Sequence, residues 1–281
     1  MARFVYVINA IGEKEPFSFE KVYRSARKSG ASNLLARNIA RTVAKEIYSG
    51  ITTAEIFKKV KKELHRISPG ASIAFNLKEG IRKLGPTGFP FEKYIAGILR
   101  DYGYKVKINQ IIPGACSKYE IDFIAEKENL LYIGECKYHN LPSGRTHLDY
   151  ALANYARFLD IKAGNFFNRF SNKFKTKSLL VTNTKLTKEA INYSKCVGVK
   201  LLGWNYPNGE GLEYLIETKK LYPITILPSL NPYLTNIFAS KKIMLAKDLL
   251  NIDVEKFSRK EKVPENKIKY LIGETKILLG K

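Results

Sequence analysis

Two apolar runs joined by a short polar turn constrain the fold of this chain more than any other feature of its sequence. The runs are Glu120–Ala125 and Leu130–Lys137, and the turn between them centres on Glu128 and Asn129. Runs of this length, rich in β-branched and aromatic residues and separated by turn residues, are typical of neighbouring strands. The sequence therefore predicts an antiparallel hairpin at this point of the chain.

Three ionisable side chains lie within the predicted hairpin. The turn sets Asp122 opposite Glu135, and Lys137 shares a face with Glu135 because side chains alternate along a strand. Facing residues of an antiparallel pair have Cβ atoms only ~4.5–5.5 Å apart, where like charges destabilise the sheet. A bound cation would remove this cost, and oxygen ligands without a His or Cys cluster favour Mg²⁺ or Mn²⁺. A surface hairpin held by salt bridges is the alternative.

Side chains on the flanking elements extend this pair into a candidate catalytic site. Lys137 beside such an ion would position the attacking water and neutralise charge on a phosphate. Glu92, on the helix before the hairpin, is the candidate third acid, and the alternative is that it caps a surface helix. Arg157, on the helix after the hairpin, either meets a phosphate or pairs with Asp160 three residues further on.

Helical and extended segments alternate around the hairpin. In chain order the sequence predicts a helix, three strands, a helix, a strand, a helix and a strand. The predicted ranges are 91–102, 104–112, 120–125, 130–137, 146–161, 178–182, a helix from 187, and 199–204. This order combines an antiparallel hairpin with βαβ crossovers, so we expect an α/β fold with a mixed central sheet flanked by helices.

The runs Glu120–Asp122 and Ile133–His139 resemble the core of the PD-(D/E)XK nucleases, and the Mrr-like restriction endonucleases among them most closely. The resemblance covers about residues 88–205 and implies an αβββαβ core that hydrolyses DNA phosphodiester bonds with a metal ion. Many Mrr-like members have Gln at the position of Glu135, so the subfamily stays open. The resemblance implies catalytic roles for Asp122, Glu135, Lys137 and Glu92, the first two also as metal ligands.

Residues 3–85 resemble an ATP-cone, a small regulatory domain that binds ATP or dATP. The expected elements are two short strands within 3–17 and helices at 18–30, 32–50, from Thr52, and 71–84. The resemblance implies nucleotide contacts for Glu15, Lys21 and Thr53. Residues 9–11 are Asn-Ala-Ile where the family has Lys-Arg-Asp, which removes phosphate donors. A basic DNA-binding or dimerising module is therefore the alternative.

Proline and glycine at positions 85–88 predict a domain boundary, because proline removes a backbone donor and glycine permits left-handed backbone. We expect an ATP-cone-like regulatory domain over 1–85, the nuclease domain over 86–228 and a helical segment over 229–281. The last segment, with helix starts at Asp253 and Pro264, resembles a helix-hairpin-helix DNA-binding unit. A small helical cap is the alternative.

The charge of the chain points to a polyanionic partner. There are 48 Lys and Arg against 26 Asp and Glu, a net charge of +22 that is spread over all three segments. DNA is the expected partner, and a lysine-rich solvated surface is the alternative. Apolar runs stay well below the ~18 residues of a membrane span, and the start of the chain lacks a signal-peptide pattern. A cytoplasmic protein without membrane contact is therefore expected.

These features together predict a Mg²⁺-dependent deoxyribonuclease. A nucleotide effector would act at the first domain, and a homodimer is a further expected partnership, since nucleases of this type often dimerise to cut both strands. A noncatalytic DNA-binding or nucleotide-sensing protein built on a nuclease-like fold is the alternative.

Overall fold

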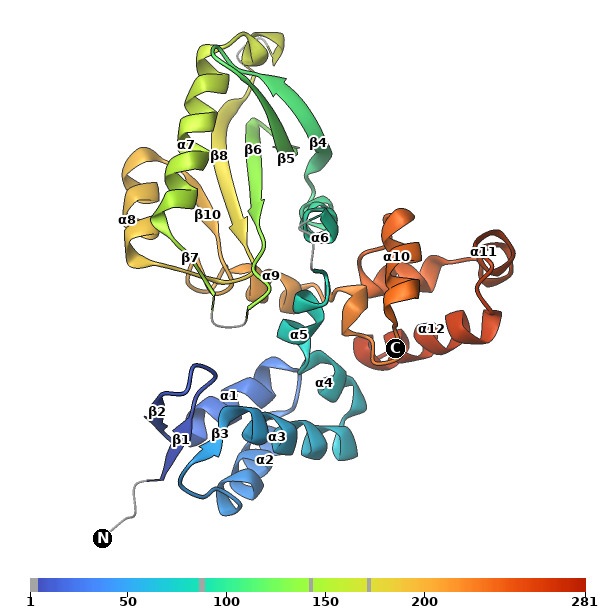
Figure 1. Ribbon diagram of the computed structural model, residues 1–281. Helices are drawn as coiled ribbons and strands as arrows, with labels where there is room; N and C mark the ends of the chain where they lie inside the picture. The colour runs from blue at the N-terminus through green and yellow to red at the C-terminus, as the bar shows by residue number, and fades with distance from the viewer. Residues whose placement is uncertain (1–4, 86–88, 142–143, 171–172) are drawn as a thin grey trace. The chain divides into compact units, whose positions relative to one another are not determined.

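The structure is a computed structural model that describes residues 5–85, 89–141, 144–170 and 173–281. The chain is α/β with mixed sheets, as predicted. It divides into two compact units (Figure 1): unit 1 consists of Met1–Gly80 and Tyr222–Lys281, and unit 2 is Ile81–Leu221. The first and last segments, which the sequence suggested as separate domains bounded at 85/86 and 228/229, thus belong to one unit. Of the break predicted at Gly85–Gly88, residues 86–88 lie outside the described residues.

The first part of unit 1 is a small three-stranded sheet covered by helices. Its strands are β1 (Tyr6–Ile8), β2 (Lys14–Pro16) and β3 (Ile51–Thr52), and β1 pairs antiparallel with β2 and parallel with β3. Its helices are α1 (Phe19–Lys28), α2 (Asn33–Lys45), α3 (Thr53–Ile67) and α4 (Pro69–Ala74), followed by α5 (Leu77–Arg82). Their shared core contains Ala26, Ile39, Ile51 and Leu64. Residues 3 and 4 of the expected strands lie outside the described residues.

Helices α1, α2 and α3 begin where the sequence predicts, whereas α4 begins at Pro69 instead of residue 71 and α2 ends earlier than predicted. The capping box is present: the Thr52 hydroxyl accepts from the Glu55 backbone N–H, and the Glu55 carboxylate accepts from the Thr52 N–H. The helix expected to reach residue 50 ends at Lys45, and the strand β3 that follows was not predicted. The helix expected over 71–84 is two helices, α4 and α5.

The second part of unit 1 consists of short helices. They are η2 (Ile224–Ile226), α10 (Pro232–Ser240), η3 (Ala246–Asn251), α11 (Val254–Glu261) and α12 (Glu265–Leu279). Asp253 caps α11 and α12 begins after Pro264, as predicted. Helix α12 packs on α4, and the backbones approach so closely that a Cβ at Gly70 would lie 2.4 Å from the Ile277 carbonyl oxygen. The two distant segments of unit 1 are therefore joined by direct packing.

Unit 2 is built on a five-stranded sheet in the order β10-β8-β6-β5-β4. Strands β4, β5 and β6 are antiparallel neighbours, and β6, β8 and β10 are parallel. This is the expected mixed sheet. The elements are α6 (Phe89–Asp101), β4 (Lys105–Pro113), β5 (Lys118–Lys127), β6 (Leu130–Lys137), β7 (Arg145–Thr146), α7 (Leu148–Ala163), η1 (Phe166–Phe170), β8 (Lys175–Thr182), β9 (Lys185–Leu186), α8 (Lys188–Val197), β10 (Lys200–Leu202) and α9 (Leu212–Thr218).

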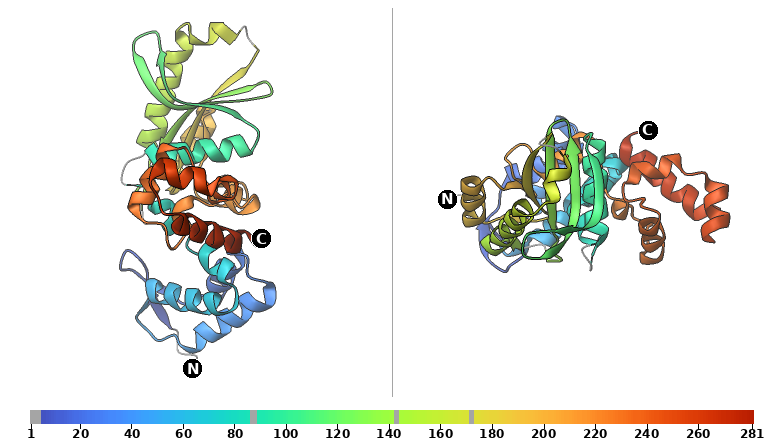
Figure 2. Two further views of the ribbon diagram at one scale, coloured as in Figure 1. Left: turned by 90° about the vertical axis from the view of Figure 1, so that its right-hand side faces the viewer. Right: turned by 90° about the horizontal axis from the view of Figure 1, so that it is seen from above.

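Helices cover both faces of this sheet. Helix α6 packs on β4, β5 and β6, whereas α7 packs on β6 and β8 and against α8. The view from above in Figure 2 shows α6 on one side of the sheet and α7 on the other. The short parallel pair of β7 and β9 was not predicted. Among the helices of the described residues, none is long and apolar enough to cross a membrane.

Candidate active site

The hairpin of β5 and β6 has the register that the sequence predicts. Its pairs run from Lys127 opposite Leu130 to Phe123 opposite Gly134, and Glu128 forms the turn with a positive φ of 54°. The regular pairing ends there, one position before Asp122 and Glu135. The two acids therefore lie where the strands part, with their side chains at the end of the ladder.

Asp122 connects the two strands just beyond the last backbone pair. Its Oδ2 accepts a hydrogen bond of 2.6 Å from the Cys136 backbone N–H. Burial nevertheless raises the pKa of Asp122 above its ordinary value, although this hydrogen bond and the nearby Arg157 both act to lower it. The hydrogen bond thus fixes the carboxylate in place, but together with Arg157 it does not fully offset the cost of burying the negative charge.

Glu135 is the most strongly perturbed acid on the hairpin. Burial and then repulsion from Asp122 raise its pKa to about 7, although Arg157 and Lys137 act to lower it. Arg157 reaches it from α7, where Nη1 of the guanidinium pairs with Oε2 of the carboxylate. A group with this pKa is half ionised near neutral pH, so a small change in its surroundings decides its charge.

Glu92 completes a group of acids from a third element. It lies in the first turn of α6 and is partly buried. Its pKa is raised to about 7, first by burial and then by the negative charges of Asp122, Glu135 and Glu120. Glu92 therefore shares the electrostatic environment of the hairpin acids.

Lys137 is held by an aromatic side chain. Its Nζ lies 4.3 Å from the centre of the Tyr150 ring, on α7. The Tyr150 ring in turn meets the His139 ring edge-on at 5.9 Å between centroids. His139 is anchored by a contact of 3.1 Å between Nε2 and the Thr146 hydroxyl. The strand end that carries Lys137 is thus fixed against the start of α7.

The donors of this group suit a hard cation. Within the described part of the chain, no three His, Cys, Asp or Glu side chains are gathered tightly enough to form a complete protein cage. A Mg²⁺ ion does not need one, because it keeps several waters and uses one or two carboxylates. Asp122 and Glu135 supply those two. Burial is the main cause of the raised pKa of both carboxyl groups, and a cation would compensate the negative charge that burial makes costly. The residues therefore fit Mg²⁺ or Mn²⁺.

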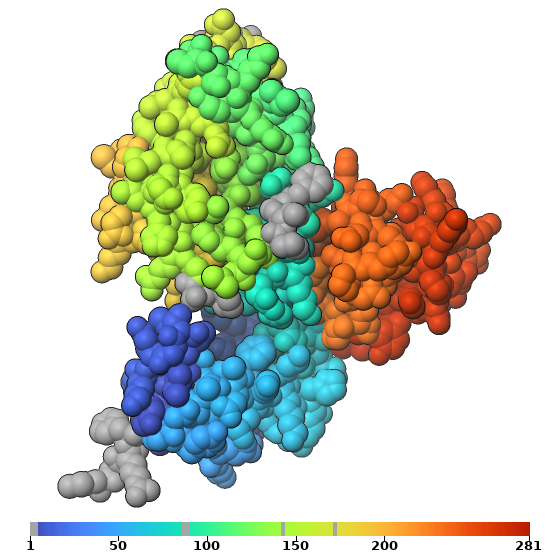
Figure 3. All heavy atoms as spheres, in the orientation of Figure 1, coloured from blue at the N-terminus to red at the C-terminus, as the bar shows by residue number. Residues whose placement is uncertain are grey.

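Helix α7 contributes two site residues, and their roles differ from expectation. Of the two alternatives considered for Arg157, the pair with Asp160 is absent: Asp160 accepts from the Cys116 and Ser117 backbone N–H groups at 2.9 and 3.2 Å. Arg157 is left to pair with Glu135. The sequence places Tyr150 on a helix expected beside the site but predicts no role for it, although its spacing of seven from Arg157 puts both on one helix face. Helix α7 lies on the surface visible in Figure 3. Its Leu152 side chain is exposed.

The residues matched to nucleotide contacts lie in the first part of unit 1. Glu15, on β2, and Lys21, on α1, form an ion pair of 2.8 Å at the surface. Thr53 is the first residue of α3, directly after the capping residue. Because β1 pairs with both β2 and β3, Glu15 and the start of α3 flank the same short strand. The structure brings Glu15 and Lys21 into contact and places Thr53 at the start of α3, directly after β3 and on the other side of β1 from Glu15.

Comparisons with known proteins identify relatives of this chain. Residues 222–279 match a family model described as AF1548-like, C-terminal. An uncharacterized protein of Archaeoglobus fulgidus is 37% identical over 186 residues, which are 66% of this chain and all of that protein. A crystal structure described as the protein of unknown function AF1548 is similar with a TM-score of 0.59 at 35% identity, covering 69% of this chain and all of that one. The chain belongs to the AF1548-like family.

Proposed function

We propose that the protein is a DNA endonuclease that hydrolyses phosphodiester bonds with Mg²⁺ or Mn²⁺. The observation that carries the proposal is the group of Asp122, Glu135 and Glu92, three partly buried carboxylates near Lys137. Burial raises the pKa of all three, and the negative charge of Asp122 raises the pKa of Glu92 and Glu135 further. Burying this much like charge is costly unless a cation joins it. The resemblance to the PD-(D/E)XK core, and the order of one helix, three strands, a helix and a strand in unit 2, support the same proposal.

Each side chain of the group has a distinct role in this proposal. Asp122 and Glu135 would hold the ion, which supplies positive charge to polarise the scissile phosphate and activate water. Lys137 opposes the negative charge that develops on the phosphate, and Tyr150 fixes the direction of its side chain. Glu92, with a pKa of about 7, can accept or release a proton near neutral pH.

The net positive charge of the chain suggests DNA as its partner, and the first part of unit 1 suggests a nucleotide as its effector. The excess of 48 basic over 26 acidic residues suits DNA, whose phosphates supply the opposite charge. The resemblance of residues 3–85 to an ATP-cone suggests regulation by ATP or dATP through Glu15, Lys21 and Thr53. Equilibrium dialysis tests this part: the absence of saturable binding at millimolar nucleotide would remove the effector and leave the nuclease proposal intact.

Cleavage of supercoiled plasmid tests the catalytic proposal. We expect nicking with Mg²⁺, none with EDTA, and losses of at least 100-fold in Asp122→Asn and Lys137→Met, as for removal of a group that stabilises transition-state charge. Glu126→Gln and Lys118→Met, on the same strand β5 but outside the acid group, serve as matched controls with unchanged rates. Nicking that persists in Asp122→Asn would refute the assignment. DNA binding without metal-dependent nicking would favour the noncatalytic alternative.

A further inference from the structure

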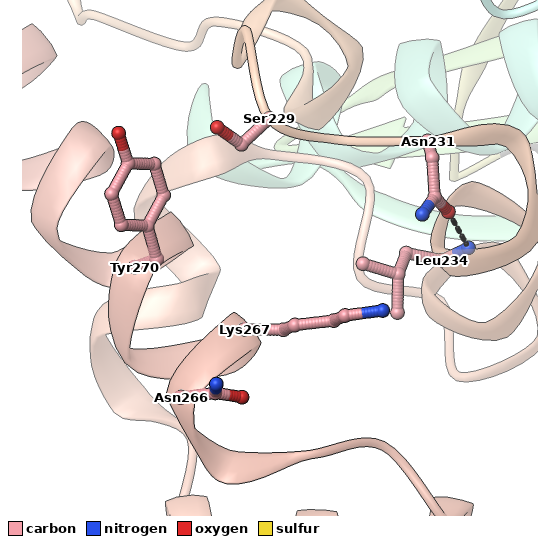
Figure 4. A pocket seen from close by; sticks show the side chains of 6 residues that line it. All are labelled: Ser229, Asn231, Leu234, Asn266, Lys267 and Tyr270. Carbon is pink, nitrogen blue, oxygen red and sulfur yellow. Dashed lines mark hydrogen bonds between the residues drawn. The ribbon is translucent and has the colours of Figure 1, made fainter.

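A pocket of about 320 Å³ lies within the segment 222–281, in the part of the chain that matches the AF1548-like C-terminal model. Its walls come from two helices, because three lining residues lie at the start of α10 or just before it and three lie near the start of α12. Figure 4 shows the six side chains around the opening. This volume is at the lower end of the range of small-ligand sites, ~300–1,000 Å³. The lining residues are Ser229, Asn231, Leu234, Asn266, Lys267 and Tyr270.

The side chains of the pocket offer hydrogen-bond donors and one aromatic ring. Asn231 uses its Oδ1 to accept from the Leu234 N–H at 2.9 Å, which leaves its amide Nδ2 available. Tyr270 is 63% exposed, so its ring can be covered by a ligand. The Lys267 side chain extends from α12 toward Leu234 on the opposite wall (Figure 4). The structure gives Lys267 no ion-pair partner among the described residues.

The charges of this segment suit an anion with many charges. Its acidic side chains already have partners: Glu261 pairs with Lys241, Glu255 with Arg259, and Glu265 with Lys269. The others are occupied too, since Asp253 caps α11, Glu274 accepts from Ser229, and Asp248 has a partner of its own. Several lysines have no acidic partner among the described residues, and these include Lys242, Lys256, Lys260, Lys262, Lys267 and Lys276. The segment that contains the pocket thus carries uncompensated positive charge, and Lys267 brings part of that charge to the pocket itself.

We propose that this pocket binds one unpaired nucleotide of single-stranded DNA. The base stacks on Tyr270, a neighbouring phosphate meets Lys267, and the Asn231 amide contacts the base edge. Aromatic rings hold bases by stacking, amides match their donors and acceptors, and an ammonium group opposes a phosphate. A free phosphate or an acidic peptide would use Lys267 but leave the Tyr270 face uncovered. The inference rests on the proposed function for its choice of DNA, but not on cleavage.

Fluorescence anisotropy with labelled oligonucleotides tests the pocket, using the full chain in EDTA so that no strand is cut. We expect Tyr270→Ala to weaken binding to a twelve-nucleotide single strand by roughly 5- to 100-fold, and to a blunt duplex much less. Lys267→Ala should reduce the slope of log K against log salt by about 0.7. Tyr233→Ala, an equally exposed tyrosine on α10 outside the pocket, and Lys256→Ala on α11 are the matched controls.

The outcomes separate this inference from the proposed nuclease activity. If Tyr270→Ala binds the single strand as well as Tyr233→Ala does, the pocket is not a nucleotide site, even where the unmodified chain nicks plasmid with Mg²⁺. If binding depends on Tyr270 but the chain never nicks plasmid, the pocket stands and the nuclease proposal fails. Crosslinking of an iododeoxyuridine oligonucleotide should label the peptide that contains Tyr270. Displacement of the oligonucleotide by polyglutamate with equal dependence on Tyr270 would overturn the choice of DNA.

Discussion

Replacing Arg157 by glutamine should strengthen the binding of divalent cations at alkaline pH. In the structure the Arg157 guanidinium pairs with Glu135, one of the two carboxylates that would hold the ion. A cation that binds Glu135 must first displace this resident positive charge. The glutamine side chain would keep much of the volume and remove the charge, so the ion would then meet an unpaired carboxylate.

The structure sets the size of this effect. The two side chains are 26% and 29% exposed, so the pair is neither fully buried nor a surface contact. Hydrogen bonds to charged groups contribute about 1.5–3 kcal/mol. Solvent screens this partly exposed pair, so we take about 1–2 kcal/mol as the free energy that the ion must spend to displace Arg157 from Glu135. At 1.4 kcal/mol for each factor of ten, this corresponds to roughly 5- to 30-fold tighter binding.

At lower pH, protonation of Glu135 reduces the expected increase in cation affinity. The pKa of Glu135 is about 7 with Arg157 beside it, and Arg157 acts to lower this pKa. Without the guanidinium the pKa rises further, so at pH 6 a proton occupies the carboxyl group and competes with the ion. The advantage of Arg157→Gln should therefore be large at pH 8.5 and small or absent at pH 6.

Electron paramagnetic resonance of free Mn²⁺, recorded under nitrogen, measures the Mn²⁺ affinity of the unmodified chain and of Arg157→Gln without requiring cleavage. Lys162→Gln, an exposed basic residue in the last turn of the same helix, is the matched control. Weaker Mn²⁺ binding by Arg157→Gln than by the unmodified chain at pH 8.5 would refute the reasoning, because Arg157 would then support the ion rather than compete with it.

Three further predictions follow from the same region. Without metal, the thermal midpoint should fall as pH rises from about 5 to 8. The pKa of Glu135 is raised to about 7 in the folded protein, so folding is favoured while this carboxyl group is protonated and loses that advantage as the group ionises. Calorimetry in EDTA should show a smaller fall in Glu135→Gln. Gly134→Ala should lower the free energy of unfolding, measured in urea, by about 1–3 kcal/mol, since the added Cβ would lie 2.1 Å from the fully buried Phe123 ring. An unchanged urea midpoint would contradict this close packing. Tyr150→Leu should slow nicking several-fold while Tyr150→Phe keeps the rate, because the ring face that holds Lys137 is lost only in the first variant; equal rates would refute a positioning role.

The hairpin could be predicted because its determinants are local. Alternation of side chains and a two-residue turn fix the register, and the register alone brings Asp122 and Glu135 to the same end of the ladder. The capping box at Thr52 was equally predictable, since both of its partners lie within four residues. Features that depend on neighbours in the chain were therefore accessible from the sequence.

Long-range partners were not accessible in this way. Spacing favoured a bond between Arg157 and Asp160, but the backbone of the loop at Cys116 occupies Asp160 from 44 positions away. The early end of α2 at Lys45 and the break between α4 and α5 likewise lack a Gly or Pro signal at the point where they occur. The union of the first and last segments in one unit has no sequence pattern of its own. Each of these features is decided by packing between segments that lie far apart in the sequence.

The division of unit 1 between the two ends of the chain has a consequence for synthesis. A ribosome makes Ile81–Leu221 before any residue of α12 exists, so unit 2 is complete while unit 1 still lacks its last segment. Helix α4 has four buried residues in six, yet its partner α12 is translated only after the whole of unit 2. The packing of Gly70 against Ile277 must therefore follow the synthesis of all of unit 2.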